Sequence, residues 1–216
     1  MTLQQADFGF QYRYRPPEGD GKGPKNTLLL LHGAGGDESS LWHLGEGVPA
    51  DVAMISPRGN VDEDGPRFFR RAAREVPDAD DLDPRIEELA AFVTSACGSL
   101  DLDPTRVWVF GYSNGATTAA ALAVQHPDVL AGGVLLASRC PFRHHGRVLD
   151  GKPFFCGHGR ADDQVSTADY EDVVELLVTA GAEIELHWYD SGHQLTDEQV
   201  KESTAWLLRQ MEKKKA

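Results

Sequence analysis

The sequence lacks the features that define several large protein classes. No apolar run approaches the ~20 residues that a membrane-spanning helix needs, and the run that stands out, Leu28 to Leu31, suits a buried strand. The first ten residues have neither a basic start nor an apolar stretch, so we expect no signal peptide. The sequence also has no internal repeat and neither the GxxxxGK[ST] nor the GxGxxG motif, which argues against a nucleotide site.

Cysteine and positive charge are also scarce. The three cysteines, Cys97, Cys140 and Cys156, are odd in number and form no CxxC pair. This argues against a disulfide framework or a structural zinc site and is typical of a reducing cytoplasm. The formal net charge of −13 favours solubility and disfavours binding to nucleic acid or anionic membranes. We therefore expect a cytoplasmic protein with a small-molecule partner; a homodimer stays open.

What the sequence does contain is a regular alternation of strand-like and helix-like segments. The 216 residues suit a single domain over 1–216. Alternating strands and helices predict an α/β fold with a mostly parallel central sheet and helices on both faces. The expected strands are 8–14, 27–31, 52–56, 106–112, 133–137, 153–156 and 184–189, and the expected helices begin at Asp83-Pro84, Asn114, Ser166 and Thr196.

One long segment, Arg58 to Leu82, shows no regular pattern and is rich in Gly, Pro, Asp and Arg. A connection of that length inside a compact domain is usually functional or mobile. We therefore expect it to contribute to a binding site or to move.

The strongest local motif is Gly111-Tyr112-Ser113-Asn114-Gly115, which has the pattern G-x-S-x-G. A strand precedes it and an alanine-rich helix follows, so the serine is expected on a sharp, strained turn that exposes its hydroxyl. The residues two before and two after the serine must be small, because they crowd neighbouring elements. Ser113 is therefore the candidate nucleophile.

A serine hydroxyl needs a base within hydrogen-bond reach, usually histidine. His193 follows the last expected strand and precedes the last helix, where it can reach the carboxyl edge of the sheet. His32 and His158 each precede a glycine at a strand end and are interpreted as structural. His144-His145 could bind a metal, but without a third ligand an exposed pair is the simpler interpretation.

The third member of such a site is an acid that lies between the serine and the histidine in chain order. Asp162 and Asp163 both follow the strand 153–156, and their positions in the sequence do not separate them. The carboxylate would hold the imidazole tautomer and stabilise the imidazolium.

An oxyanion hole needs two backbone N–H groups aimed at the developing charge. One is expected from Asn114, which follows the serine, and the other from Ala34 in the glycine-rich loop after the strand 27–31. This chemistry requires neither a metal nor a cofactor, and we expect none.

Four segments together resemble the phospholipase/carboxylesterase group of α/β-hydrolases: LLLLHGAGGDESSLW, GYSNGA, HGRADDQV and GHQLTDE. The resemblance runs from about Leu28 to the C-terminus and implies the α/β-hydrolase fold. It implies that Asp162 rather than Asp163 is the acid, and it supports Ala34. SPRGNVDEDGPRFFRR and GHQLT are more similar to the bacterial MhqD-type hydrolases, a group linked to quinone or hydroquinone resistance.

The sequence departs from the better-known thioesterase pattern of this group at two places. Asn114 replaces the usual glutamine after the serine, and PRFFRR replaces a segment bearing Trp-Phe-Asp. The oxyanion contact is a backbone group, so Asn114 leaves it intact, whereas the altered loop bears on the choice of substrate.

These observations predict a serine carboxylesterase that cleaves small carboxylic esters through an acyl-enzyme. A thioesterase, or a hydrolase of lactones or esters from aromatic or quinone degradation, is the alternative. A non-catalytic binding protein is disfavoured because every triad position is filled. A ring-cleavage lactone hydrolase typically has cysteine in place of Ser113, and a true lipase needs more chain for a lid.

The segment Gly65 to Arg71 sets Phe68 and Phe69 among arginines in an otherwise acidic protein. In one interpretation the phenylalanines wall the acyl pocket, and Arg70 or Arg71 faces an anionic substrate. In the other, the phenylalanines pack the loop onto the core, and the arginines pair with nearby acids, which are Asp62, Glu63, Asp64 and Glu75.

Overall fold

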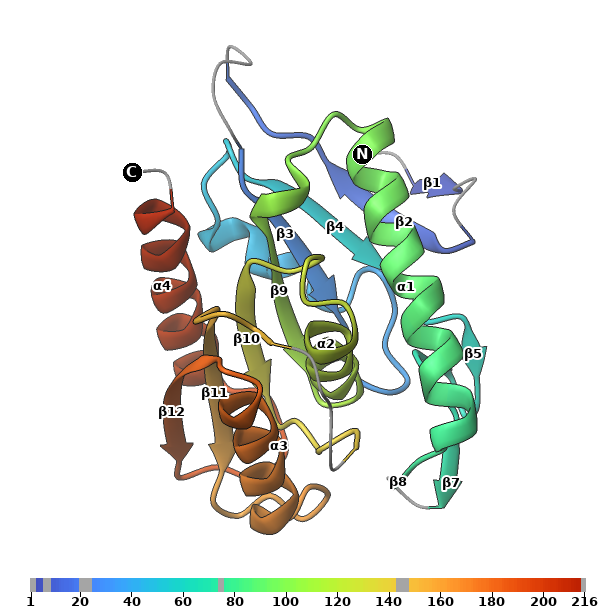
Figure 1. The fold of residues 1–216 in the computed structure, drawn as a ribbon, viewed down its shortest axis with the longest axis vertical. Coiled ribbons are helices and arrows are strands. Elements are labelled where there is room, and N and C mark those ends of the chain that lie inside the picture. The colour runs from blue at the N-terminus through green and yellow to red at the C-terminus, as the bar shows by residue number, and fades with distance from the viewer. Residues whose placement is uncertain (1–2, 6–8, 20–24, 74–75, 143–147, 215–216) are drawn as a thin grey trace.

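The computed structural model describes residues 3–5, 9–19, 25–73, 76–142 and 148–214 (Figure 1). His144 and His145, and with them the interpretation of that pair, lie outside the described residues, as do Phe8, Glu75 and Lys215.

The centre of the fold is an eight-stranded sheet with the order β1-β2-β4-β3-β9-β10-β11-β12. β1 and β2 are antiparallel to their neighbours, and the pairs from β4 through to β12 are parallel. This confirms the predicted mostly parallel sheet. The strands are β1 (Leu3–Gln5), β2 (Gln11–Arg15), β3 (Thr27–Leu31), β4 (Ala53–Pro57), β9 (Val107–Tyr112), β10 (Gly132–Leu136), β11 (Pro153–Gly159) and β12 (Glu183–Tyr189).

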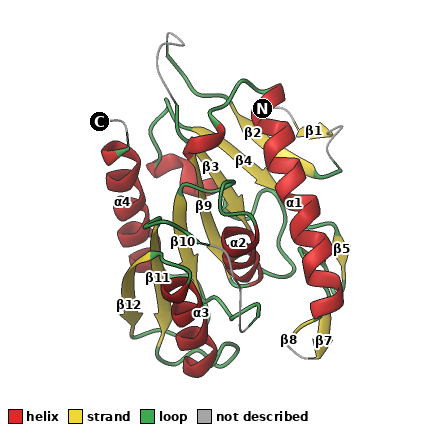
Figure 2. Cartoon of the chain, in the orientation of Figure 1, coloured by secondary structure: helices red, strands yellow, loops and turns green. Residues whose placement is uncertain are grey.

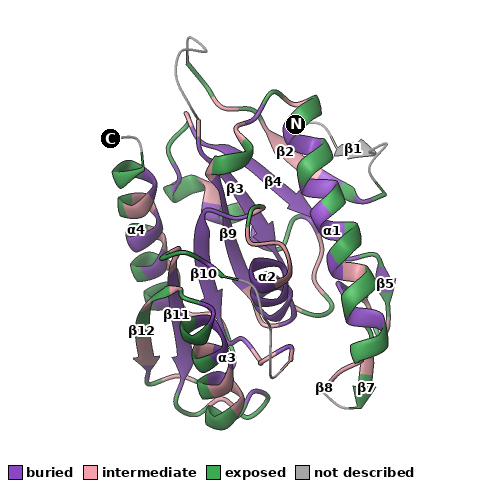
Figure 3. Cartoon of the chain, viewed as in Figure 1, coloured by how far each residue is buried: buried purple, intermediate pink, exposed green. Residues whose placement is uncertain are grey.

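Helices cover both faces of this sheet (Figure 2). Because side chains alternate along a strand, Leu29 and Leu31 pack with α1, α2 and α3, whereas Leu28 and Leu30 pack with α4 and η1. The central strands are buried on both sides, and β12, at the edge, is largely exposed (Figure 3). The helices are η1 (Trp42–Gly47), α1 (Ala79–Ser99), η2 (Pro104–Arg106), α2 (Asn114–Gln125), α3 (Thr167–Thr179) and α4 (Asp197–Lys213).

The first long helix begins earlier than the Asp83-Pro84 motif predicts. Asp78 is the N-cap of α1, since its side chain accepts a hydrogen bond from the Asp80 N–H, and Pro84 lies inside the helix. Pro77 precedes this cap and ends β8, so the strand and the helix meet at this point. The prediction was wrong by about one turn because Asp78 supplies an earlier N-cap, with Asp80 and Asp81 in the first turn that follows it.

The other helix ends follow their capping residues. Ser166 caps α3, whose end is followed by Gly181 at φ +88°, and Thr196 and Gln199 form a capping box at the start of α4. The starts of these two helices at Ser166 and Thr196 were predicted. Among the described helices, none combines the length and apolar character that crossing a membrane requires.

The segment 58–82 is more ordered than a plain loop. It folds into two short antiparallel ribbons, one of β5 (Val61–Asp62) with β6 (Pro66–Arg67), the other of β7 (Arg71–Ala73) with β8 (Val76–Pro77). Strands of two or three residues are too short for a period-two pattern to reveal. The ribbons lie beyond the carboxyl ends of the parallel strands, near the start of α1 (Figure 1).

Candidate active site

Ser113 occupies the turn between β9 and α2. Its backbone has φ 52° and ψ −115°, a left-handed conformation that side chains rarely adopt. The turn is tight: a Cβ on Gly111 would lie 2.7 Å from the Cα of Ala116, and one on Gly115 would overlap the carbonyl oxygen of Leu31. Glycine at both positions is therefore what allows the strained serine to stand at the head of α2.

A chain of hydrogen bonds joins Ser113, His193 and Asp162. Ser113 Oγ lies 3.0 Å from His193 Nε2, and His193 Nδ1 lies 2.8 Å from Asp162 Oδ2. An ionised carboxylate can only accept, so Nδ1 carries the ring proton and Nε2 presents its lone pair to the serine hydroxyl. The structure thus brings together the three residues that the sequence singles out.

The carboxylate of Asp162 is fixed from two sides. Its Oδ1 accepts from the N–H groups of Gln164 at 2.8 Å and Val165 at 2.9 Å, which leaves Oδ2 for the histidine. The side chain is fully buried, whereas Asp163 is exposed. Of the two aspartates that the sequence left open, Asp162 is the one within reach of His193.

The loops that carry His193 and Asp162 are tied to each other and to the serine turn. The Ala161 N–H donates to the carbonyl of Ser191, two residues before His193, at 3.0 Å. The Tyr112 hydroxyl, whose pKa burial raises, donates to the carbonyl oxygen of His193 at 2.9 Å. These contacts hold the backbone of His193 in place, and this positions its imidazole.

The glycine-rich loop after β3 lies against the serine turn and is held by His32. The Gly59 N–H donates to His32 Nε2 at 2.9 Å, so the opposite nitrogen, Nδ1, carries the proton and bonds the Gly33 carbonyl at 2.7 Å. Burial lowers the pKa of His32, which keeps the ring neutral for this arrangement. Within the described residues, the N–H groups of Ala34 and Asn114 have no protein acceptor and are available to a ligand.

The side chain of Asn114 ties the serine turn to the segment 66–69. Its Oδ1 accepts from the Phe68 N–H at 2.9 Å. The departure from glutamine at this position therefore accompanies the altered loop that packs on it.

A cavity of about 20 Å³ adjoins Ser113. Its apolar wall consists of Phe69, Pro77, Ala137 and Val165. Its polar lining consists of Ser113, Asn114, Thr117, Arg67 and Arg139. Arg139 follows the carboxyl end of β10, where ligands of parallel sheets bind, so this general rule could have identified it from the sequence.

The predicted substrate loop divides between the core and the cavity. Phe68 is buried and stacks on His32, with the ring centroids 4.8 Å apart, while Phe69 lines the cavity. Arg70 pairs with Asp81 at 3.2 Å, and Arg71 pairs with Glu63 and Asp64.

Arg70 and Arg71 are thus not among the described residues that line the cavity, and the arginine of this segment that does so is Arg67. Arg67 was not predicted, because nothing in the sequence shows which of the three arginines in this segment the ribbon turns inward.

His158, interpreted as structural, lies under the acid. It is 1% exposed and stacks on Tyr170 at 4.6 Å, and its Nδ1 is 3.8 Å from Asp162 Oδ2. Burial lowers its pKa, so it packs beside the carboxylate as a neutral ring.

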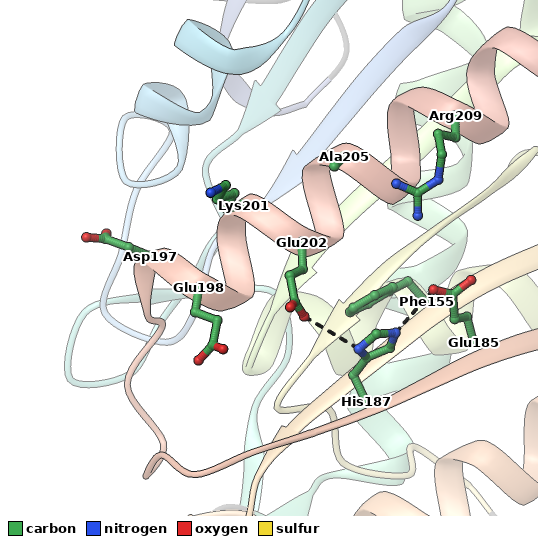
Figure 4. Close-up of a pocket in the computed structure, with 9 residues that line it drawn as sticks. All are labelled: Phe155, Glu185, His187, Asp197, Glu198, Lys201, Glu202, Ala205 and Arg209. Atoms are coloured by element: carbon green, nitrogen blue, oxygen red, sulfur yellow. Dashed lines mark hydrogen bonds and ion pairs between the residues drawn. The ribbon is translucent and has the colours of Figure 1, made fainter.

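A much larger cavity, of about 740 Å³, lies between α4 and β12 (Figure 4). Its described lining carries both charges, with His187 between Glu185 and Glu202, but it contains no serine or cysteine that could act as a nucleophile. The described residues also include no cluster of three or more metal-ligating side chains. The candidate nucleophile therefore lies at the small cavity beside Ser113 and not at the larger one.

The model of the phospholipase/carboxylesterase family matches residues 18–208. A curated protein of Bacillus subtilis (strain 168), named "Putative hydrolase MhqD", is 38% identical over 185 residues, which cover 84% of this chain and 92% of the relative.

Solved structures of carboxylesterases have the same fold. The carboxylesterase of Bacillus cereus is 36% identical with a TM-score of 0.88, and the match covers 94% of this chain and 96% of that one. The carboxylesterase of Mesorhizobium loti is 29% identical with a TM-score of 0.85, covering 96% and 98% respectively. The architecture described above is therefore the α/β-hydrolase fold.

Proposed function

Because this chain belongs to the phospholipase/carboxylesterase family of α/β-hydrolases, we propose that it is a serine hydrolase that cleaves small carboxylic esters through an acyl-enzyme. The observation that carries this proposal is the hydrogen-bonded chain from Ser113 through His193 to Asp162, with separations of 3.0 and 2.8 Å. Nucleophile, base and orienting acid are each within reach of the next.

In the first half of the reaction, Ser113 Oγ attacks the ester carbonyl carbon and its proton passes to His193 Nε2. The imidazolium is stabilised by Asp162, whose second oxygen is already occupied by two backbone N–H groups. The charge that develops on the carbonyl oxygen is taken up by the N–H groups of Ala34 and Asn114. Collapse breaks the bond to the alcohol oxygen, which leaves with the proton from His193.

In the second half, water repeats the sequence. His193 accepts a proton from the water as its oxygen attacks the acyl carbon, and then returns that proton to Ser113 Oγ as the acid leaves. No metal or cofactor takes part in the proposed steps.

The size of the cavity supports a small substrate. A volume of about 20 Å³ admits a group of a few heavy atoms, whereas pockets for drug-sized ligands run to several hundred Å³. We propose that the ester group seated beside Ser113 is short.

The same proposal extends to organisation and location. The sheet and its helices support one domain over residues 1–216, and the family match over 18–208 agrees with that extent. The three described cysteines are free thiols, which supports the reducing cytoplasm as the site of action.

Replacement of the nucleophile tests the proposal. Ser113→Ala should lower the turnover of short esters by about 10⁶, while circular dichroism and the melting temperature stay close to those of the wild type. A variant that keeps more than a few per cent of the activity would mean that another residue is the nucleophile.

A further inference from the structure

The polar groups that line the cavity beside Ser113 are hydrogen-bond donors. Thr117 Oγ1 already accepts from the Arg139 backbone N–H at 3.1 Å, so its hydroxyl proton is left for a ligand. In the described part of the chain, no aspartate or glutamate lines this cavity.

Asn114 adds a buried donor with no partner. Its Oδ1 is taken by the Phe68 N–H, but its Nδ2 has no acceptor among the described residues, although the residue is only 6% exposed. A buried amide donor that has no acceptor destabilises the folded protein. A hydrogen-bond acceptor on the substrate would satisfy this donor.

Two arginines, Arg67 and Arg139, line the same cavity and bring positive charge to it. Arg67 is 3% exposed and pairs with Glu63 at 3.2 Å. The side chain of Arg139 is 16% exposed and bonds Asp169 at 2.7 Å and the carbonyl of Gln164 at 2.6 Å.

The partner carboxylates Glu63 and Asp169 do not line the cavity. They hold the two guanidinium groups in place from outside, while the surface toward the ligand remains donor-rich.

We infer that this cavity binds a carboxylate carried by the substrate, so that the natural ester is a monoester of a short dicarboxylic acid or another short ester bearing a free carboxylate. The inference rests on the proposed function, since it names the substrate class of the same site. A carboxylate is acceptor-only, planar and small enough for a cavity of about 20 Å³, and it matches both the arginines and the unpaired amide of Asn114. A neutral amide of the same shape would direct its own N–H groups at other donors.

Matched esters test the inference. The substrates are the monoethyl esters of malonic, succinic and glutaric acid, each paired with the analogue in which the free carboxylate is a primary carboxamide. Ethanol release is measured at about 0.15 M salt, which screens the long-range repulsion from this acidic protein. For at least one chain length, kcat/KM should favour the carboxylate by about tenfold or more, because hydrogen bonds to charged groups are the strong ones.

Arg67→Met should remove most of that preference, and Arg70→Met is the matched control. Arg70 belongs to the same segment but pairs with Asp81 and does not line the cavity. Arg70→Met should therefore leave the ratio unchanged.

Since Arg67 is buried and its variant could misfold, Asn114→Asp is the second test. It keeps the acceptor for the Phe68 N–H but replaces the cavity donor with a negative oxygen, and it should shift the ratio toward the amide.

The outcomes separate the inference from the proposed function. If the wild type cleaves carboxylate and amide esters equally at all three lengths, or if Arg67→Met and Asn114→Asp lower both rates by the same factor, the carboxylate site is wrong and the esterase stands. If no ester is cleaved, the proposed function is wrong, and calorimetric binding of the paired esters to the wild type decides the inference. Tighter binding of the carboxylate supports it, and equal or undetectable binding overturns it.

Discussion

At the residue scale, backbone hydrogen bonds determine which of two adjacent aspartates contacts His193. The chain offers two adjacent aspartates after β11, and only backbone geometry distinguishes them. The N–H groups of Gln164 and Val165 both bond Oδ1 of Asp162, which turns Oδ2 toward His193. The neighbouring Asp163 is exposed.

Substitution of each aspartate by asparagine tests this assignment. Asp162→Asn should lower kcat for a short ester by about 10⁴, because an amide at this position favours the wrong imidazole tautomer. Asp163→Asn, the matched control, should lower kcat less than about twofold. Steady-state kinetics of both variants decides between them, and a reversed order would move the acid to Asp163.

At the element scale, the turn from β9 into α2 depends on close contact between main chains. The first turn of α2 presses on the end of β3, so that a side chain at Gly115 would meet the carbonyl oxygens of Leu31 and His32. The same contact brings the loop with Gly33 and Ala34 next to Ser113. The packing of α2 against the end of β3 therefore positions both Ser113 and the loop that contains Ala34.

Two glycine-to-alanine substitutions separate this contact from ordinary helix propensity. Gly115→Ala should lower the free energy of unfolding by at least about 2 kcal/mol, because backbone atoms cannot move aside easily. Gly98→Ala, at an exposed position in α1 where a Cβ would meet nothing within 4 Å, should raise it by about 0.5–1 kcal/mol. Denaturant unfolding measures both, and equal effects would contradict the packing argument.

The elements that the sequence predicts well are those with a long apolar pattern or a capping residue. β3 and β9 are continuous apolar runs, and α3 and α4 begin at the predicted caps Ser166 and Thr196. The start of α1 was missed because Pro84 resembles a first-turn residue.

The candidate site was predictable only in part, because some of its residues have a sequence motif and others do not. The order of Ser113, Asp162 and His193 along the chain is visible in motifs. The position of Arg139 after the carboxyl end of β10 follows from a general rule, whereas the inward turn of Arg67 depends on tertiary contacts, which no local pattern carries.

At the scale of the whole molecule, two histidines are buried as neutral rings, His32 just after β3 and His158 in β11. His32 and His158 are each 1% exposed, and burial lowers both pKa values below the ordinary value of 6.5. At His32, Asp37 and Glu38 oppose this lowering of the pKa, and Arg58 adds to it. At His158, Asp162 and Asp169 oppose the lowering, and His193 adds to it. Desolvation is the largest cause in each case.

Stability should therefore fall on mild acidification. As pH drops below 6.5 these two histidines take up protons in the unfolded chain before they do so in the folded protein, so their contribution is complete above 6.5 and declines below it. Each histidine can reduce the free energy of unfolding by up to about 1.4 kcal/mol per pH unit.

Urea unfolding at pH 7.5 and 5.5 measures this loss. His32→Gln keeps an acceptor for the Gly59 N–H but cannot titrate, so its stability should change less between the two pH values. An unchanged slope in the variant would show that His32 does not contribute.

The central claim is that His193 activates Ser113 as a nucleophile, and covalent labelling tests it most directly. A fluorophosphonate reacts when an activated serine oxygen attacks phosphorus and displaces fluoride, so intact-mass spectrometry followed by peptide mapping locates the adduct. The wild type should gain the mass of one phosphonyl group, mapped to the peptide containing Ser113, while Ser113→Ala gains none and His193→Ala reacts far more slowly. A wild type that stays unmodified, or an adduct of equal yield in Ser113→Ala, would contradict the account.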